Sequence, residues 1–433
     1  MTNITNSNFV HTHVHSSYSA FDGLTSVHDL VHKVRKMGFK SLALTDHGSI
    51  GGWVKFLQEC SAQQDKNGKD IPYPQIKPLL GVEAYLCNNR FVKSKREQPS
   101  GRRGNTHLIL LAKNWKGYEN ICKLVNTSWV EGFYMDPRID MDVLSQCSEG
   151  VIVSTACLKG IININLLHGR YAEAKRIATC FKDIFKDDFF FEVMYHGINA
   201  QRIIMPDIFR LAMELNIPIC ASNDCHYLEK EHAASHEVLM AMATGRCLSD
   251  PKRMRFPYGE FYLKDINEMV KIFGSHPRVL TNTVMLAERV DTEDIRKNLY
   301  SGMRLPRFEV PFGFASPLEY LRHLATQGLV KLGWDKSPEH IAAFEKELED
   351  IKVAYDNNKY DFATYFLIVH DYINHAKKKG ILIGPGRGSG YASVILRCLG
   401  VTYGINPLQA GLWERFLGFK NAKFVKADDF YSE

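Results

Sequence analysis

Hydrophobic positions in the first 220 residues follow two alternating patterns, one with the period of a helix and one continuous. Over residues 27–37 valine, leucine and methionine recur three and four positions apart, and Gly38 ends the segment. The short apolar run SLALTD follows at residues 41–46. The sequence therefore predicts a helix that leads into a buried strand.

The same alternation repeats along the chain. Continuous apolar runs predict strands at LLGVEAYL (79–86), HLILLA (107–112), VIVST (151–155), FFFEVM (189–194) and IPICAS (217–222). Helical spacing predicts helices at 114–127, 171–184 and 200–215. Strands without a polar face are typical of a parallel sheet or an α/β barrel that is covered on both faces. The predicted fold class is therefore α/β.

The alternation stops near residue 285, and helices then dominate. Helical patterns cover 316–332, 342–358 and the segment YFLIVHDYINHAKKKG (365–380), and the apolar run ILIG (381–384) predicts a strand. A chain of 433 residues exceeds one ordinary core. The sequence thus predicts two domains, residues 1–285 and 286–433.

Composition narrows the setting of the protein. Hydrophobic residues make up 45% of the chain and charged residues 24%, as in folded globular proteins. The ten cysteines include no CxxC pair, which is typical of a reduced compartment. Neither a signal peptide nor a membrane-length apolar run is found, so we expect a cytoplasmic protein without membrane contact. The net charge of +6 permits a polyanionic partner, and the basic stretch at 93–104 is interpreted as an exposed, solvated loop.

Metal-binding residue types collect where the predicted strands end. The segment HTHVHSSYSAFDG (11–23) places histidines on alternate positions, so those at 13 and 15 face one side of an extended segment. Further candidates follow the later apolar runs, namely His47, Cys157, Asp224 and His226. Carboxyl ends of strands are where α/β barrels build their sites.

Six ordered motifs, HVHSSYSAFDG, LTDHG, GVEAY, THLILLA, STAC and SNDCHY, resemble the PHP (polymerase and histidinol phosphatase) domain of bacterial DNA polymerase III alpha subunits. The resemblance implies a PHP-type distorted (β/α) barrel, followed by a mostly helical region that leads into a partial polymerase palm. It also implies nine metal ligands: His13, His15, Asp22, His47, Glu83, His107, Cys157, Asp224 and His226. Members of the family with the complete set resemble metal-dependent 3′–5′ proofreading exonucleases.

The implied site would hold two or three divalent ions that grip a phosphodiester. A thiolate from Cys157 would suit manganese, zinc or iron better than magnesium. Glu83 is interpreted as the carboxylate that bridges two ions, and His11 lies outside the set. Asp46 either orients a ligand histidine or serves the turn, and the sequence leaves both readings open.

A glycine-dense segment, ILIGPGRGSGYASVILRCLG (381–400), lies in the second predicted domain. A strand, a glycine loop and a following helix can bind phosphate through backbone N–H groups and the helix N-terminus. The spacing matches neither the dinucleotide fingerprint nor the P-loop. With YFLIV and ERFL on either side, it resembles the palm loop of C-family polymerases. That resemblance implies that Arg387, Gly388, Ser389 and Arg415 bind the triphosphate of an incoming nucleotide.

Members of the polymerase family continue after ERFL to a PDxDxD-like strand whose aspartates hold magnesium. Asp428 and Asp429 are adjacent here and would face opposite sides of a strand, so no catalytic residue for polymerisation is assigned. We therefore expect a split or partial polymerase whose partners are primer-template DNA, deoxynucleoside triphosphates and a second chain with the remaining carboxylates. A stand-alone PHP phosphoesterase and a non-catalytic scaffold are the alternatives.

Overall fold

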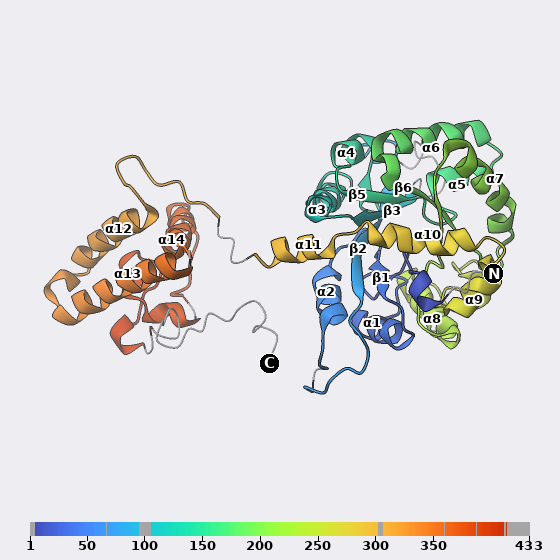
Figure 1. Ribbon diagram of the computed structural model, residues 1–433. Coiled ribbons are helices and arrows are strands. Elements are labelled where there is room, and N and C mark those ends of the chain that lie inside the picture. Colours follow the sequence, from blue (N-terminus) through green and yellow to red (C-terminus); the bar gives the residue numbers. More distant parts are fainter. Residues whose placement is uncertain are drawn as a thin grey trace. The chain divides into compact units, whose positions relative to one another are not determined.

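A seven-stranded sheet organises the first part of the chain (Figure 1). The computed structural model describes residues 5–65, 67–94, 105–301, 306–358, 360–386, 388–410 and 413. Two compact units are present, Met1–Leu299 and Tyr300–Glu433. The predicted boundary near residue 285 falls within helix α10 (Pro277–Glu288), which packs against the sheet of the first unit.

The predicted strands of the first unit are confirmed, and a short strand, β4, adds to them. Their bounds are β1 Ser41–Leu44, β2 Lys77–Leu86, β3 Thr106–Ala112, β4 Arg138–Ile139, β5 Val151–Ser154, β6 Phe189–Val193 and β7 Ile219–Ala221. They are ordered β1-β2-β3-β5-β6-β7, with β4 paired to β2. The predicted α/β class, with a curled sheet followed by a mostly helical region, is thus confirmed.

The expectation of a purely parallel sheet is wrong for one strand. Strand β3 runs antiparallel to both of its neighbours, β2 and β5, whereas the β1–β2, β2–β4, β5–β6 and β6–β7 pairs are parallel. Parallel neighbours need a crossover, usually a helix, while antiparallel neighbours do not. The described part of the β2–β3 connection, residues 87–94 and 105, contains no helix. Strand β3 pairs with β2 in the antiparallel direction from Gly81 to Leu86.

The two edges of the curled sheet are joined by the segment that carries the first histidines. The amide of Ala43 in β1 donates to the carbonyl of His11 at 3.0 Å, and the amide of His15 donates to Cys225 at 2.8 Å. Isolated bridges pair His11 with Leu42 and Val14 with Cys225. Residues 11–15 are thereby held between β1 and the stretch that follows β7.

Alternate residues of each strand bury on opposite faces of the sheet, as the two-residue period requires. On β3, Leu108 and Leu110 belong to the large core beneath the surrounding helices. Ile109 and Leu111 belong to a smaller cluster that contacts Leu286 of α10. The smaller cluster fills one end of the inner face. Toward the other end of the inner face, the side chains that point to this same side of the sheet are polar.

Most helices cover the outer face of the sheet with their apolar stripes, whereas α10 packs against one end of the inner face. The first unit contains α1 Val27–Lys36, α2 Trp53–Ser61, α3 Trp115–Val130, α4 Met141–Gln146, α5 Ile161–Leu167, α6 Tyr171–Phe185, α7 Asn199–Leu215, α8 Ala233–Ala243, α9 Ile266–Phe273, α10 and α11 Thr292–Leu299. Among the described helices, none is long and apolar enough to span a bilayer.

The described second unit is helical. It contains α12 Pro317–Lys331, α13 Pro338–Asn358, α14 Phe362–Lys378, the 3-10 turn Gly388–Ala392 and α15 Val394–Cys398. The three long helices confirm the sequence predictions, but the predicted strand at 381–384 is wrong. Leu382 is 99% exposed, and the described residues of this unit include no strand with which that segment could pair.

Candidate metal centre

The inner face of the sheet is polar at the end opposite α10. Glu83 on β2 and His107 on β3 share the strand parity of the small apolar cluster, so they point to the same side of the sheet. His47 follows β1, and Cys157 follows β5. Because several strands end here, side chains from distant parts of the sequence meet in one region.

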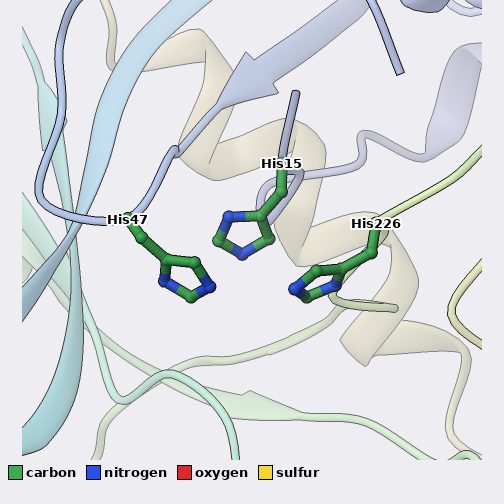
Figure 2. Close-up of side chains that lie close together, drawn as sticks. All are labelled: His15, His47 and His226. Atoms are coloured by element: carbon green, nitrogen blue, oxygen red, sulfur yellow. The ribbon is translucent and has the colours of Figure 1, made fainter. Parts of the chain in front are cut away.

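Three histidines from different segments lie together at the centre of this region (Figure 2). The ring of His15 lies 4.2 Å from that of His47 and 4.3 Å from that of His226, centroid to centroid. His13 is the neighbour of His15 in the extended segment, and their Nε2 atoms are 3.2 Å apart. The alternate spacing of the two histidines therefore does place both on one side.

Glu83 lies close to four histidines, His13, His15, His47 and His107. Its carboxylate oxygens lie 2.6 Å from Nδ1 of His47 and 2.6 Å from Nδ1 of His107. Nε2 of His13 and Nε2 of His15 are each 3.6 Å away. Three ligand-like groups result, His15 with His47 and His226, His13 with His15 and Glu83, and His47 with Glu83 and His107.

The remaining candidates surround the same atoms. Oδ1 of Asp224 lies 3.1 Å from Nε2 of His13. Oδ2 of Asp22 lies 3.2 Å from Nε2 of His47, and Sγ of Cys157 lies 3.7 Å from Nδ1 of His107. The structure thus brings all nine sequence-predicted residues into one largely buried site, and their role as ligands stays a prediction.

Several polar atoms of the site are buried without a hydrogen-bond partner. They are Oδ1 of Asp22, Nδ1 of His47, Oε2 of Glu83, Oδ1 of Asp224 and Nε2 of His226. Leaving buried polar atoms unpaired costs free energy. Nδ1 of His47 and Oε2 of Glu83 are close but not aligned as donor and acceptor. Lone pairs directed at shared cations account for such an arrangement, so the residues fit a divalent metal site.

Charge pairing in the site shifts its proton affinities. Burial lowers the pKa of His13, but Asp224 and Glu192 outweigh burial and hold that pKa well above its usual range. Burial and the neighbouring imidazoles of His47 and His226 lower the pKa of His15 to about 3.

The pKa of the Cys157 thiol is shifted upward. Burial, followed by the charge of Glu83 and of Asp224, raises its pKa well above the ordinary value. Burial and these carboxylates therefore favour the protonated thiol, and a cation that bound the thiolate would release this proton.

Glu192 on β6 is a part of the site that the sequence predictions missed. Its buried carboxylate lies 2.7 Å from Nδ1 of His13 and accepts the hydroxyl hydrogens of Ser154 and Ser222. The signal in the sequence is a single acidic residue within the apolar run FFFEV. A carboxylate only accepts, so it directs the Nδ1 proton of His13 toward itself and leaves Nε2 facing the site.

Asp46 acts on His15 in a similar but indirect way. Its carboxylate accepts from the amide of Ser16 at 2.7 Å and from the hydroxyl of Ser19 at 2.8 Å. Oγ of Ser19 lies 3.0 Å from Nδ1 of His15. Asp46 therefore orders the turn and also reaches the ring of His15 through Ser19, while the role of His15 as a ligand stays a prediction.

Other buried histidines serve the surrounding structure. His11 lies outside the nine, as predicted, and its Nε2 is 2.9 Å from the carbonyl of Lys264. His196 contacts the carbonyl of Asn223 at 3.0 Å and stacks on Phe261. Residue type alone does not separate these histidines from the cluster.

The predicted nucleotide site lies in the second unit and is only partly described. Arg387 and Arg415 lie outside the described residues, and Gly388 and Ser389 begin an exposed 3-10 turn. The helix that follows, α15, does not offer its N-terminus to a phosphate. The Glu347 carboxylate already accepts the amides of Val394 at 2.6 Å and Ile395 at 3.0 Å. That element of the predicted anion site is wrong, because an acidic side chain of the chain itself occupies it.

Two family profiles match the chain. The PHP domain matches residues 11–196, which include the site except for Asp224 and His226. The profile described as the bacterial DNA polymerase III alpha NTPase domain matches residues 319–429. Together they cover parts of both units.

Full-length relatives show the same kinship. The chain is 37% identical over 426 residues to a DNA polymerase III subunit alpha of Borreliella burgdorferi, covering 98% of the chain and 35% of the relative. It is 38% identical over 425 residues to that of Treponema pallidum, covering 98% of the chain and 34% of the relative. The chain thus spans about a third of these relatives' length. A solved amidohydrolase structure from Chromobacterium violaceum aligns over 50% of this chain and 87% of its own, at 12% identity and a TM-score of 0.32.

Proposed function

Because the chain belongs to the bacterial DNA polymerase III alpha family, of which it spans the amino-terminal PHP-containing third, we propose that it acts in DNA replication and that its PHP domain is a metal-dependent 3′–5′ proofreading exonuclease. The family membership carries the replication context. The exonuclease activity needs a separate argument from the site.

The convergence of nine metal-binding side chains with unpaired buried atoms carries that argument. A metal that only stabilised the fold would need about four ligands in a closed shell. Three overlapping groups that share Glu83, His15 and His47 instead favour two or three neighbouring ions. Adjacent ions of this kind are typical of enzymes that cleave phosphodiesters.

Divalent ions held here would supply charge that polarises a phosphodiester and lowers the pKa of water. The residues of the chain do the rest. Glu192 and Asp46, through Ser19, orient His13 and His15, and the buried walls exclude bulk solvent from the carboxylates. The thiol of Cys157 beside His107 favours manganese, zinc or iron over magnesium.

The decisive experiment is degradation of a primer with a mismatched 3′ end in the presence of Mn²⁺. We expect the wild-type chain to shorten it, and His13→Ala and EDTA to abolish shortening. The matched control is His168→Ala, which removes an exposed histidine of the same unit. Equal degradation by the wild type, His13→Ala and the EDTA sample would show that a contaminant is responsible. No degradation by any sample would favour the scaffold alternative.

We further propose that the second unit contributes to nucleotide binding in a complete polymerase. Gly388, Ser389, Arg387 and Arg415 would contact the triphosphate, and Mg²⁺ together with catalytic carboxylates would come with further polypeptide. Primer extension tests this proposal, since the chain alone should not extend a primer and a complementing chain should restore extension. A stand-alone phosphoesterase would show metal-dependent hydrolysis with no effect of such a chain.

A further inference from the structure

Two aromatic side chains stack in the open beside the metal centre. Trp129, in the last turn of α3, and Phe133, just after that helix, have ring centroids 5.4 Å apart and nearly parallel planes, at 12°. Trp129 is 51% exposed and Phe133 is 46% exposed. A large planar apolar surface in solvent is unfavourable unless something covers it.

This aromatic pair is attached to the loop that carries a candidate ligand. The indole Nε1 of Trp129 donates to the carbonyl of Gly48 at 3.0 Å, and Gly48 directly follows His47. Gly48 has a φ of +55°, and a Cβ there would lie 2.5 Å from Cγ of Pro137. The segment with the aromatic pair therefore packs tightly on the residue next to His47.

Hydrogen bonds also hold the backbone at Gly132 and Phe133 in place. The buried guanidinium of Arg138 donates from Nε to the carbonyl of Gly132 at 2.8 Å, and Lys93 Nζ donates to the carbonyl of Phe133 at 2.9 Å. A Cβ at Gly132 would lie 1.9 Å from the carbonyl oxygen of Arg138, so the two backbones are in direct contact. Preorganised aromatic rings lose little entropy when a flat ligand binds.

Other exposed groups around the site suit a phosphate with bases attached. Phe21, adjacent to Asp22, is 70% exposed. Lys159 is exposed two residues after Cys157, and its charge acts on both Cys157 and His107. A cation beside the ion cluster attracts an anion to it.

We propose that Trp129 and Phe133 form a base-stacking platform for a single-stranded nucleic acid whose phosphodiester lies at the metal centre. The inference rests on the proposed hydrolytic function and adds to it how the strand is held. Stacking is insensitive to base identity, which suits an enzyme that must accept any sequence at a strand end. A protein partner is less favoured, because the platform is attached to a ligand loop.

Binding to strands with and without bases tests the platform directly. A fluorescent dodecathymidylate would be titrated by anisotropy in Mn²⁺, with phosphorothioates at its three last linkages to slow cleavage. A second strand would lack the bases of its two 3′-terminal nucleotides. We expect wild type to bind the abasic strand about five-fold or more weakly, as one stacked base would predict.

The variants separate stacking from folding. Phe133→Ala and Trp129→Ala should lose the preference for bases, whereas Trp129→Phe, which keeps a ring but not the bond to Gly48, should retain it. Phe312→Ala, an exposed aromatic residue of the second unit, is the matched control and should also retain it.

Equal affinity of the wild type for both strands would overturn the inference. An undiminished preference for bases in Phe133→Ala and Trp129→Ala would overturn it too, and would favour a protein partner for the aromatic pair. A wild type that prefers bases but does not cleave an unprotected strand in Mn²⁺ would refute the proposed hydrolase and leave the platform standing.

Discussion

Replacement of Glu192 by glutamine should weaken metal binding without unfolding the protein. The carboxylate is buried, with Oε1 2.7 Å from Nδ1 of His13 and the hydroxyls of Ser154 and Ser222 directed at it. It can only accept hydrogen bonds, so it keeps the ring proton on Nδ1 and leaves Nε2 for the ion. The amide of glutamine can instead donate to Nδ1, which would favour the tautomer with the proton on Nε2.

The expected loss follows from the way such partners act at known metal sites. Removing a hydrogen-bond partner of a ligand histidine typically lowers metal affinity ~10- to 100-fold, or about 1.4 to 2.7 kcal/mol. Glutamine keeps the size of the side chain, so cavity formation adds nothing. Glu192→Ala removes the hydrogen-bond acceptor altogether and should lower metal affinity further.

Competition with a chromophoric chelator for Zn²⁺ measures this affinity, and circular dichroism checks that each variant is folded. Glu214→Gln is the control. Glu214 is likewise a hydrogen-bonded glutamate, paired with Lys175 and Arg210, but it lies at the surface away from the site. An affinity of Glu192→Gln within two-fold of wild type would refute the positioning role of Glu192.

Three further predictions follow from buried carboxylates and from the metal itself. Asp46→Asn should weaken Zn²⁺ binding less than Glu192→Gln does, because Asp46 reaches His15 only through Ser19. The same competition assay measures this affinity, and a larger loss than in Glu192→Gln would contradict the indirect role of Asp46. Burial raises the pKa of Glu347 from 4.5 to about 7. The folded state therefore holds this proton more tightly than the unfolded state, so the stabilisation is complete below about pH 4.5 and falls by about 3 kcal/mol as pH rises through 7. Urea unfolding at pH 5 and pH 8 should show most of this loss in the wild type but not in Glu347→Gln. EDTA should lower the melting temperature of the first unit alone, since an ion at 100 times its Kd adds about 2.7 kcal/mol to the free energy of unfolding. If EDTA shifted neither calorimetric transition, the result would argue against bound metal.

Local pattern was sufficient for most of the secondary structure. The helix at 27–36 has an apolar stripe, and Ser26 caps it by accepting the amide of Asp29, both of which are visible within a dozen residues. Strand ends could be recognised in the same way, so the segments that carry the candidate ligands were predictable. The nine residues themselves came from resemblance to a family, since an HxH pair or a lone cysteine has little specificity.

Long-range pairing was not predictable in this way. The apolar run of β3 is equally compatible with either direction, and only its neighbours β2 and β5 make it antiparallel. The run ILIG has strand-like composition but no partner strand among the described residues, so it forms no strand and is largely exposed. A strand is stabilised by its neighbours, which the local sequence does not contain.

The sequence by itself determined the order of helices and strands and the placement of metal-binding residue types at strand ends, because both depend on spacing of a few residues. Only the tertiary structure decided which charges meet. Glu192 reaches His13 across 179 positions, and Glu347 reaches Val394 across 47. Such contacts depend on how the strands curl and the helices pack, and in a buried setting they decide which proton, ion or helix end each side chain serves.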